Sequence, residues 1–279
     1  VDQGGLLVDR RAGRISTEET APICEILNKI EIEGIELNVY PVRDYRFVLV
    51  MRGPGLSYEL TETDPQRIGI APLKVKASTP SAERTAHAAN EFIMAAQQIL
   101  AGREIANMIM LRGFSSLPNL PSMSQLYQLK PAAIAAYPMY RGLAKIVGMS
   151  VVDCGSSFDD EIDALEKHGL EHDFIYLHYK PADAAGEDGD FSAKVSALED
   201  LDKYIPRIRA LNPDVLIVCG DHSTPAVLAG HSWHPVPFLI HSTWTSGDTV
   251  QEFSESAFAQ GSLATMPASQ VMSIALAHA

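Results

Sequence analysis

Apolar residues occur along the chain in short runs of strand length, separated by longer stretches in which they recur every three or four residues. The first pattern is typical of buried strands and the second of helices that bury one face. The short apolar runs predict strands at 47–51, 108–111, 134–136, 150–152, 173–179, 214–219 and 236–241. Helices are predicted at 81–100, which is rich in Ala, Glu and Gln, and at 192–211.

The order of these elements divides the chain. Residues 1–112 mix helix and strand, whereas strands and helices alternate after residue 130. Such alternation favours a mostly parallel sheet with helices on both faces. The stretch 113–125 holds two prolines and four serines, and we expect a linker there.

Composition limits the class of protein. The chain has 279 residues, 46% of them apolar, and a mean hydropathy of +0.01, which excludes disorder and predicts one large core or two smaller ones. No apolar run approaches the roughly 20 residues of a membrane span. A net charge of −13 argues against nucleic acid or a membrane as partner. Three cysteines without metal-like spacing, and no signal peptide, indicate a reducing compartment and lead us to expect a cytoplasmic protein.

Carboxylates and imidazoles follow the apolar strands of the second half. Asp183 and Glu187 come after the strand at 173–179, and Asp221 and His222 directly after the strand at 214–219. His231 lies shortly before the last strand, and eight of the nine histidines fall within 168–278. Ligands of such sheets gather beyond the carboxyl ends of the strands, so these groups are candidate metal ligands.

Each motif has a simpler interpretation when taken alone. Asp221 and His222 could be a helix cap and a surface histidine, and 183–190 could be a solvated acidic loop. The three motifs together, each beside a separate strand, favour a metal site. Adjacent ligands such as Asp221 and His222 suit two neighbouring ions, the arrangement usual in phosphoryl chemistry.

Arginines gather in the first half. Arg10, Arg11 and Arg14 fall within five positions, and further arginines flank the two strands predicted there, at Arg46, Arg52 and Arg112. Guanidinium groups match phosphate and carboxylate oxygens with paired hydrogen bonds, so the cluster indicates an anion pocket. Surface arginines with acidic partners are the alternative.

Several of these segments together resemble a known family. The segments are 8–15, 45–57, 63–65, 82–86 with 90–92, 107–113, 140–144 with 148–149, 178–191 and 221–237. In this order they are similar to the 2,3-bisphosphoglycerate-independent phosphoglycerate mutases of the archaeal type, within the alkaline phosphatase superfamily. The stretch Asp221-His222-Ser223-Thr224-Pro225 followed by His231 is the most specific match.

The resemblance implies an α/β fold: an alkaline-phosphatase-like, mostly parallel sheet with helices on both faces, plus a smaller inserted α+β domain. Residues 1–120 would be most of the inserted, substrate-gripping domain, and 121–279 the later part of the metal-binding domain. The family moves phosphate between the 3- and 2-hydroxyls of glycerate through a phosphoserine, with two divalent ions, Mn²⁺, Mg²⁺ or Zn²⁺.

Carried over by position, the resemblance assigns roles to individual residues. Asp183, Glu187 and His231 would hold one ion, and Asp221 and His222 the other. The small phosphorylated substrate would meet basic side chains, and the candidates are Arg10, Arg14, Arg46, Arg52, Arg112 and Lys180.

Two departures from the family pattern keep other functions open. Position 187 is Glu where the family has His, and no segment here matches the family's leading stretch with its serine nucleophile, so we expect that segment and the nucleophile to lie outside this chain. The alternatives are a metal-dependent phosphatase or phosphomutase for another small phosphate ester, and an inactive, truncated or divergent metal-binding homologue. The sequence leaves the oligomeric state open.

Overall fold

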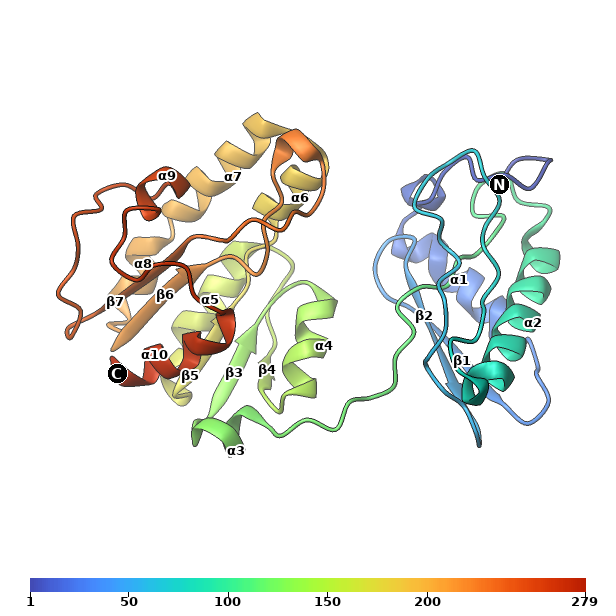
Figure 1. Ribbon diagram of the computed structural model, residues 1–279, viewed down its shortest axis with the longest axis horizontal. Helices are drawn as coiled ribbons and strands as arrows, with labels where there is room; N and C mark the ends of the chain where they lie inside the picture. Colours follow the sequence, from blue (N-terminus) through green and yellow to red (C-terminus); the bar gives the residue numbers. More distant parts are fainter. The chain divides into compact units, whose positions relative to one another are not determined.

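A computed structural model describes residues 1–279 and divides them into two compact units, Val1–Asn119 and Leu120–Ala279 (Figure 1). Residues 113–122, within the expected linker, contain no helix or strand. The short helix α3 (Met123–Tyr127) begins inside that stretch, because Ser122 and Gln125 form a reciprocal capping box at its start.

The first unit is built from two helices and a hairpin. Helix α1 (Thr17–Leu27) is followed by strands β1 (Glu36–Pro41) and β2 (Phe47–Arg52), which pair antiparallel. Helix α2 (Glu83–Leu100) is the longest, and the short 3₁₀ turns η1 (Ala12–Arg14) and η2 (Pro80–Ala82) precede α1 and α2. The strand predicted at 47–51 and the helix predicted at 81–100 are thereby confirmed.

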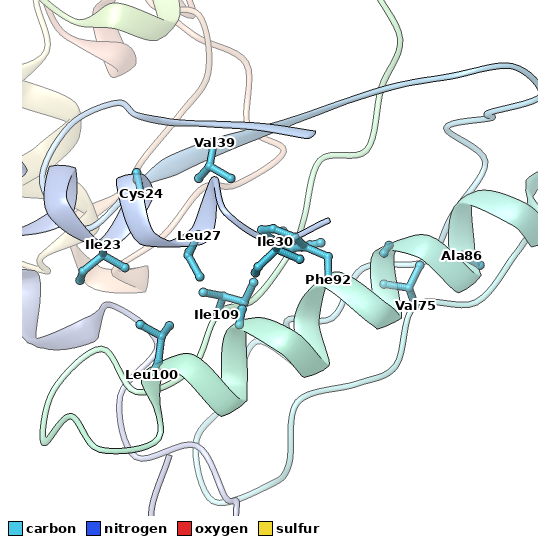
Figure 2. Close-up of a cluster of buried hydrophobic side chains, with 13 residues drawn as sticks. Ile23, Cys24, Leu27, Ile30, Val39, Val75, Ala86, Phe92, Leu100 and Ile109 are labelled. Atoms are coloured by element: carbon cyan, nitrogen blue, oxygen red, sulfur yellow. The ribbon is translucent and has the colours of Figure 1, made fainter. Parts of the chain in front are cut away.

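One core holds the first unit together (Figure 2). Phe92 and Leu100 of α2 pack with Leu27 of α1 and Val39 of β1, and all four side chains are almost fully buried. The strand predicted at 108–111 is wrong. Ile109 and Leu111 do enter this core, but the segment pairs with no strand. The backbone N–H and C=O of Leu111 form their hydrogen bonds with the backbone N–H and the hydroxyl of Thr63 instead.

The second unit contains a parallel sheet of order β4-β3-β5. Its strands are β3 (Pro131–Ile134), β4 (Ser150–Val152) and β5 (Phe174–Leu177). Neighbouring residues of β3 point to opposite faces: Ala133 packs with helix α4 (Pro138–Ile146), and Ile134 packs with helix α5 (Phe158–His168). Helices therefore cover both faces, as predicted.

The second unit also contains a separate two-stranded sheet. Strands β6 (Val215–Cys219) and β7 (Phe238–Ser242) pair antiparallel, a direction that their apolar runs alone could not predict. The remaining elements are η3 (Gly169–Glu171), α6 (Pro181–Glu187), α7 (Phe191–Asp202), α8 (Ile205–Ala210), η4 (Ala226–Leu228), α9 (Glu255–Phe258), η5 (Ala268–Gln270) and α10 (Val271–Ala277).

The helix predicted at 192–211 is two helices. Helix α7 ends at Asp202 and α8 begins at Ile205. Pro206 has no N–H to donate to the carbonyl of Asp202, and the missing hydrogen bond favours a break at this turn. None of the helices in either unit combines the length and the apolar character needed to cross a membrane.

Candidate functional site

Three side chains of the second unit converge on one point. Asp183, His222 and His231 each offer a ligand atom, and these atoms all lie within 4.8 Å of one another. Asp183 stands in the first turn of α6, directly after β5, and His222 follows β6. His231 lies in the segment between η4 and β7. An isolated β-bridge between Ser223 and Ser232 joins this segment to the loop after β6, so that His222 and His231 become neighbours. The loops that follow the strands thus bring the predicted groups together.

The distances within this cluster suit a shared cation. Asp183 Oδ1 lies 3.8 Å from His222 Nδ1 and 3.9 Å from His231 Nε2, and the two imidazole centroids are 4.0 Å apart. Asp183 is largely buried, whereas His231 is exposed. The cluster is therefore open to solvent on the His231 side.

Asp183 is held by hydroxyl and ammonium donors. Thr224 Oγ1 donates to Asp183 Oδ1 at 2.6 Å, and Lys180 Nζ contacts Oδ2. Burial by itself raises the pKa of Asp183, but these two donors outweigh it, and the pKa lies below its ordinary value. The carboxylate is thus ionised at neutral pH, as a metal ligand must be.

Gly186 allows the backbone of Thr224 to lie close against helix α6. A Cβ at this position would overlap the Thr224 carbonyl oxygen, which also accepts a hydrogen bond of 2.6 Å from Lys194 Nζ. A larger residue at 186 would therefore displace Thr224, and with it the donor to Asp183.

Glu187 and Asp221, the other two predicted ligands, border the cluster. Glu187 Oε1 lies 3.5 Å from His231 Nε2, and Asp221 Oδ2 lies 3.6 Å from His222 Nε2. His222 therefore has Asp183 on its Nδ1 side and Asp221 on its Nε2 side. The sequence grouped His222 with Asp221 alone, but the structure places it between both carboxylates.

These residues fit a divalent cation. One carboxylate oxygen and two imidazole nitrogens form the donor set, with two further carboxylates at its border. Oxygen and nitrogen donors of this kind bind Mn²⁺, Mg²⁺ or Zn²⁺. The Lys180 ammonium lies against Asp183 in this structure and partly neutralises its charge.

Sequence reasoning missed three residues beside the cluster. Tyr140, in the first turn of α4, donates its hydroxyl to Asp221 Oδ2 at 3.0 Å, and its ring stacks on His178 at 3.5 Å. Burial lowers the pKa of His178 to about 4, so this ring is neutral. Thr224 was visible in the motif after Asp221, but no spacing rule indicated Tyr140 or His178.

The predicted basic residues of the first unit do not form one group. Arg10 and Arg112 meet on the buried carboxylate of Asp64. Arg52 pairs instead with the exposed Glu36 at 3.3 Å, and the Arg46 guanidinium lies 4.9 Å from the ring centre of Tyr45. The Arg10 hydrogen bonds hold the pKa of Asp64 below its usual range.

The segment that carries Arg10 and Arg14 is tightly folded. Ala12, Gly13 and Arg14 have positive φ angles of 50°, 64° and 54°. This conformation costs roughly 1–2 kcal/mol at each non-glycine residue. The Asp9 carboxylate offsets part of that cost, because it accepts hydrogen bonds from the backbone N–H groups of Arg11 and Gly13.

Family models of known proteins match residues in both units of the chain. Residues 73–278 match the Metalloenzyme superfamily, and residues 1–106 match the 2,3-bisphosphoglycerate-independent phosphoglycerate mutase family. Relatives named probable 2,3-bisphosphoglycerate-independent phosphoglycerate mutase are 45% identical over 278 residues in Thermotoga neapolitana and 44% identical over 282 residues in Aquifex aeolicus. The matches cover 99% and 98% of this chain and 69% of each relative.

The chain belongs to the 2,3-bisphosphoglycerate-independent phosphoglycerate mutase family. Its membership in the Metalloenzyme superfamily confirms the expectation of divalent metal binding.

Two solved structures share the fold of this chain, and the first of them also carries the family name. A cofactor-independent phosphoglycerate mutase from Thermoplasma acidophilum is 26% identical, with a TM-score of 0.64, and the match covers 99% of this chain and 73% of that one. A protein from Pyrococcus horikoshii has a TM-score of 0.77 at 23% identity, over 98% of this chain and 71% of that one. The predicted α/β fold is thereby confirmed.

Proposed function

We propose that the protein interconverts 3-phosphoglycerate and 2-phosphoglycerate. In the net reaction the P–O bond at one glycerate oxygen breaks, a P–O bond forms at the neighbouring oxygen, and one proton moves the opposite way. The observation that carries the proposal is the convergence of Asp183, His222 and His231 in a chain of this family. The relatives bear mutase names, which favours this reaction over hydrolysis of another phosphate ester.

Two groups of side chains would hold the divalent ions. Asp183, Glu187 and His231 form the first group, and Asp221 and His222 the second. Bound ions would neutralise phosphoryl oxygens and lower the pKa of a coordinated hydroxyl.

The hydrogen bonds around His222 support this grouping. Thr224 gives its only hydroxyl proton to Asp183, so toward His222 Nδ1, 3.1 Å away, it can act only as acceptor. With its proton on Nδ1, His222 would not ligate an ion beside Asp183 through that nitrogen, and its Nε2 lone pair would serve an ion on the side of Asp221, in the second group. A carboxylate and an imidazole nitrogen thus face the same point.

Basic side chains would bind the anionic substrate. Arg10 and Arg112 offer guanidinium groups in the first unit, and Arg14 and Arg46 lie in segments of that unit that also carry positive charge. Lys180 sits on Asp183, where it would give way to a metal ion or contact a phosphoryl oxygen. Arg52 remains a candidate, although its guanidinium faces Glu36.

The test is conversion of 3-phosphoglycerate by the purified full-length protein loaded with Mn²⁺. We expect 2-phosphoglycerate to form without added 2,3-bisphosphoglycerate, and the activity to disappear after chelation and return with Mn²⁺. Release of free phosphate without 2-phosphoglycerate would identify a phosphatase instead. No turnover of either kind by the full-length, metal-loaded protein would refute the proposal.

A further inference from the structure

The first unit contains a buried carboxylate with two arginines on it. The Asp64 side chain is only 4% exposed. Arg10 donates to it through Nε at 2.8 Å and Nη2 at 2.6 Å, and Arg112 through Nη1 at 3.4 Å. The backbone N–H of Gln66 donates a fourth bond at 2.8 Å. Asp64 thus brings together two cations that are 102 residues apart in sequence.

Both arginines keep donors that point away from Asp64. Arg10 uses one edge of its guanidinium, which leaves Nη1 without a partner in the chain, and its side chain is 31% exposed. Arg112 makes one long contact and is 60% exposed. Two positive charges against one negative charge leave the group with a net charge of +1, so it can attract an anion.

The backbone on each side of this group is fixed. Leu111 and Thr63 exchange three hydrogen bonds, and the N–H of Gly113 donates to Glu62 at 2.9 Å. The segment of Asp64 is therefore tied to the segment of Arg112. The Asp9 turn restrains the backbone beside Arg10 in the same way. Such restraint keeps donors in place before a ligand arrives.

Another arginine in the chain shows what an ordinary ion cluster looks like. Arg207 donates to Glu166 through Nε and Nη2, the same edge that Arg10 uses on Asp64. It also donates to Asp159 and Asp163, so three exposed carboxylates surround one guanidinium. That cluster is net negative and offers nothing to an anion, whereas the Asp64 group is net positive.

We propose that Asp64 is a positioning residue that holds Arg10 and Arg112 as a paired guanidinium site for an oxyanion of the substrate. The inference rests on the proposed function, which supplies a substrate with one phosphate and one carboxylate group. Asp64 itself touches no substrate and acts only through the two arginines. Both substrate groups suit a guanidinium pair, and inorganic phosphate and glycerate distinguish them as probes.

The main test is D64N, with E166Q as the matched control. E166Q removes the charge of a carboxylate that accepts the same arginine edge elsewhere in the chain. We expect D64N to raise KM for 3-phosphoglycerate at least tenfold, with kcat within about threefold of the wild-type value, and E166Q to change neither. A purely structural loss would lower kcat through the folded fraction and leave KM unchanged.

Two further variants keep the test decisive if D64N folds poorly. R112Q alters an exposed side chain with one long contact and should fold normally, yet raise KM at least tenfold. In an R10Q background, D64N should raise KM by a clearly smaller factor than in the wild-type protein, since part of its effect passes through Arg10. R112Q with KM within twofold of wild type, or an undiminished D64N effect in R10Q, would overturn the inference.

Binding experiments separate this inference from the proposed function. The Arg10 Nε–H resonance reports ligand binding without turnover, and we expect inorganic phosphate or glycerate to shift it in the wild-type protein. A saturable shift that D64N weakens at least tenfold supports the site even if 3-phosphoglycerate is not converted. No shift with phosphate, glycerate or 3-phosphoglycerate would overturn it, even in an active mutase.

Discussion

Tyr140 shows how one hydroxyl can orient a predicted ligand. Its O–H reaches Asp221 Oδ2 at 3.0 Å, while its ring stays stacked on His178. Groups that orient metal ligands typically contribute 10–100-fold to metal affinity. We therefore expect Tyr140→Phe, which keeps the ring and removes the hydroxyl, to weaken Mn²⁺ binding about tenfold in isothermal titration calorimetry.

Tyr179→Phe is the matched control for that variant. Its hydroxyl donates to the Ala197 carbonyl at 2.7 Å, away from the cluster. It should cost about 1 kcal/mol of stability, as a lost hydrogen bond does, and leave Mn²⁺ affinity unchanged. Equal Mn²⁺ affinity in Tyr140→Phe and wild type would show that Asp221 needs no such orientation.

Glu187 tests the identity of the metal. A carboxylate favours harder ions, whereas an imidazole in its place favours Zn²⁺. Because Glu187 Oε1 lies 3.5 Å from His231 Nε2, we expect Glu187→His to raise the preference for Zn²⁺ over Mn²⁺ about tenfold in competition dialysis. An unchanged preference would mean that Glu187 does not touch the ion.

A site residue could be predicted from the sequence where a neighbouring strand fixes its position, and not where a contact distant in sequence does. Asp183 and His222 lie directly after apolar strands, and the carboxyl ends of strands are where ligands gather. Tyr140 lies 81 residues before Asp221, so only the fold reveals their contact. Likewise, Arg10 and Arg52 look alike in sequence, yet one reaches a buried carboxylate and the other an exposed one.

At the scale of elements, helix α5 carries a buried acid. Glu161 is 4% exposed; its Oε1 accepts a hydrogen bond from the Ala136 N–H, and its Oε2 has no partner. Burial raises the pKa of Glu161 to about 7, although the Ala136 hydrogen bond opposes the change. The folded state therefore binds this proton more tightly than the unfolded chain, and ionisation destabilises the fold.

The sign of the pH dependence follows from linkage. Between the ordinary glutamate pKa of 4.5 and about 7, the folded protein keeps a proton that the unfolded chain has lost, so stability falls as pH rises. Glu161→Gln removes this contribution. We expect the stability of the variant relative to wild type to increase by about 3 kcal/mol from pH 4.5 to pH 7.5, measured by urea unfolding. A difference that stays constant with pH would contradict the raised pKa.

The bounds of a helix or strand could be predicted where the residues of that element determine them. The apolar runs gave strands β4 and β6 within one residue, because buried strands need such runs. The break between α7 and α8 follows from Pro206, a signal that the helical repeat concealed. Residues 108–111 form no strand because Leu111 bonds to Thr63, which is distant in sequence. The antiparallel direction of β7 is defined by its pairing with β6. Neither feature could be predicted from the residues of the segment itself.

At the scale of the whole molecule, the local charge of a side-chain group can differ in sign from the net charge of the chain. The chain carries −13, yet the Asp64 group keeps a local charge of +1. All five candidate metal ligands lie between residues 183 and 231, within the second unit, while the arginine candidates lie in the first. The acidic balance therefore excludes neither a metal site nor a small anionic substrate.

The most direct test of this account is the Mn²⁺ stoichiometry of the wild-type protein and of Asp183→Asn, measured by equilibrium dialysis. Asp200→Asn is the control, because Asp200 pairs with Lys203 three residues away, as Asp183 pairs with Lys180. The account predicts two ions in wild type and in the control, and at least one fewer in Asp183→Asn. Equal binding by all three proteins would contradict it.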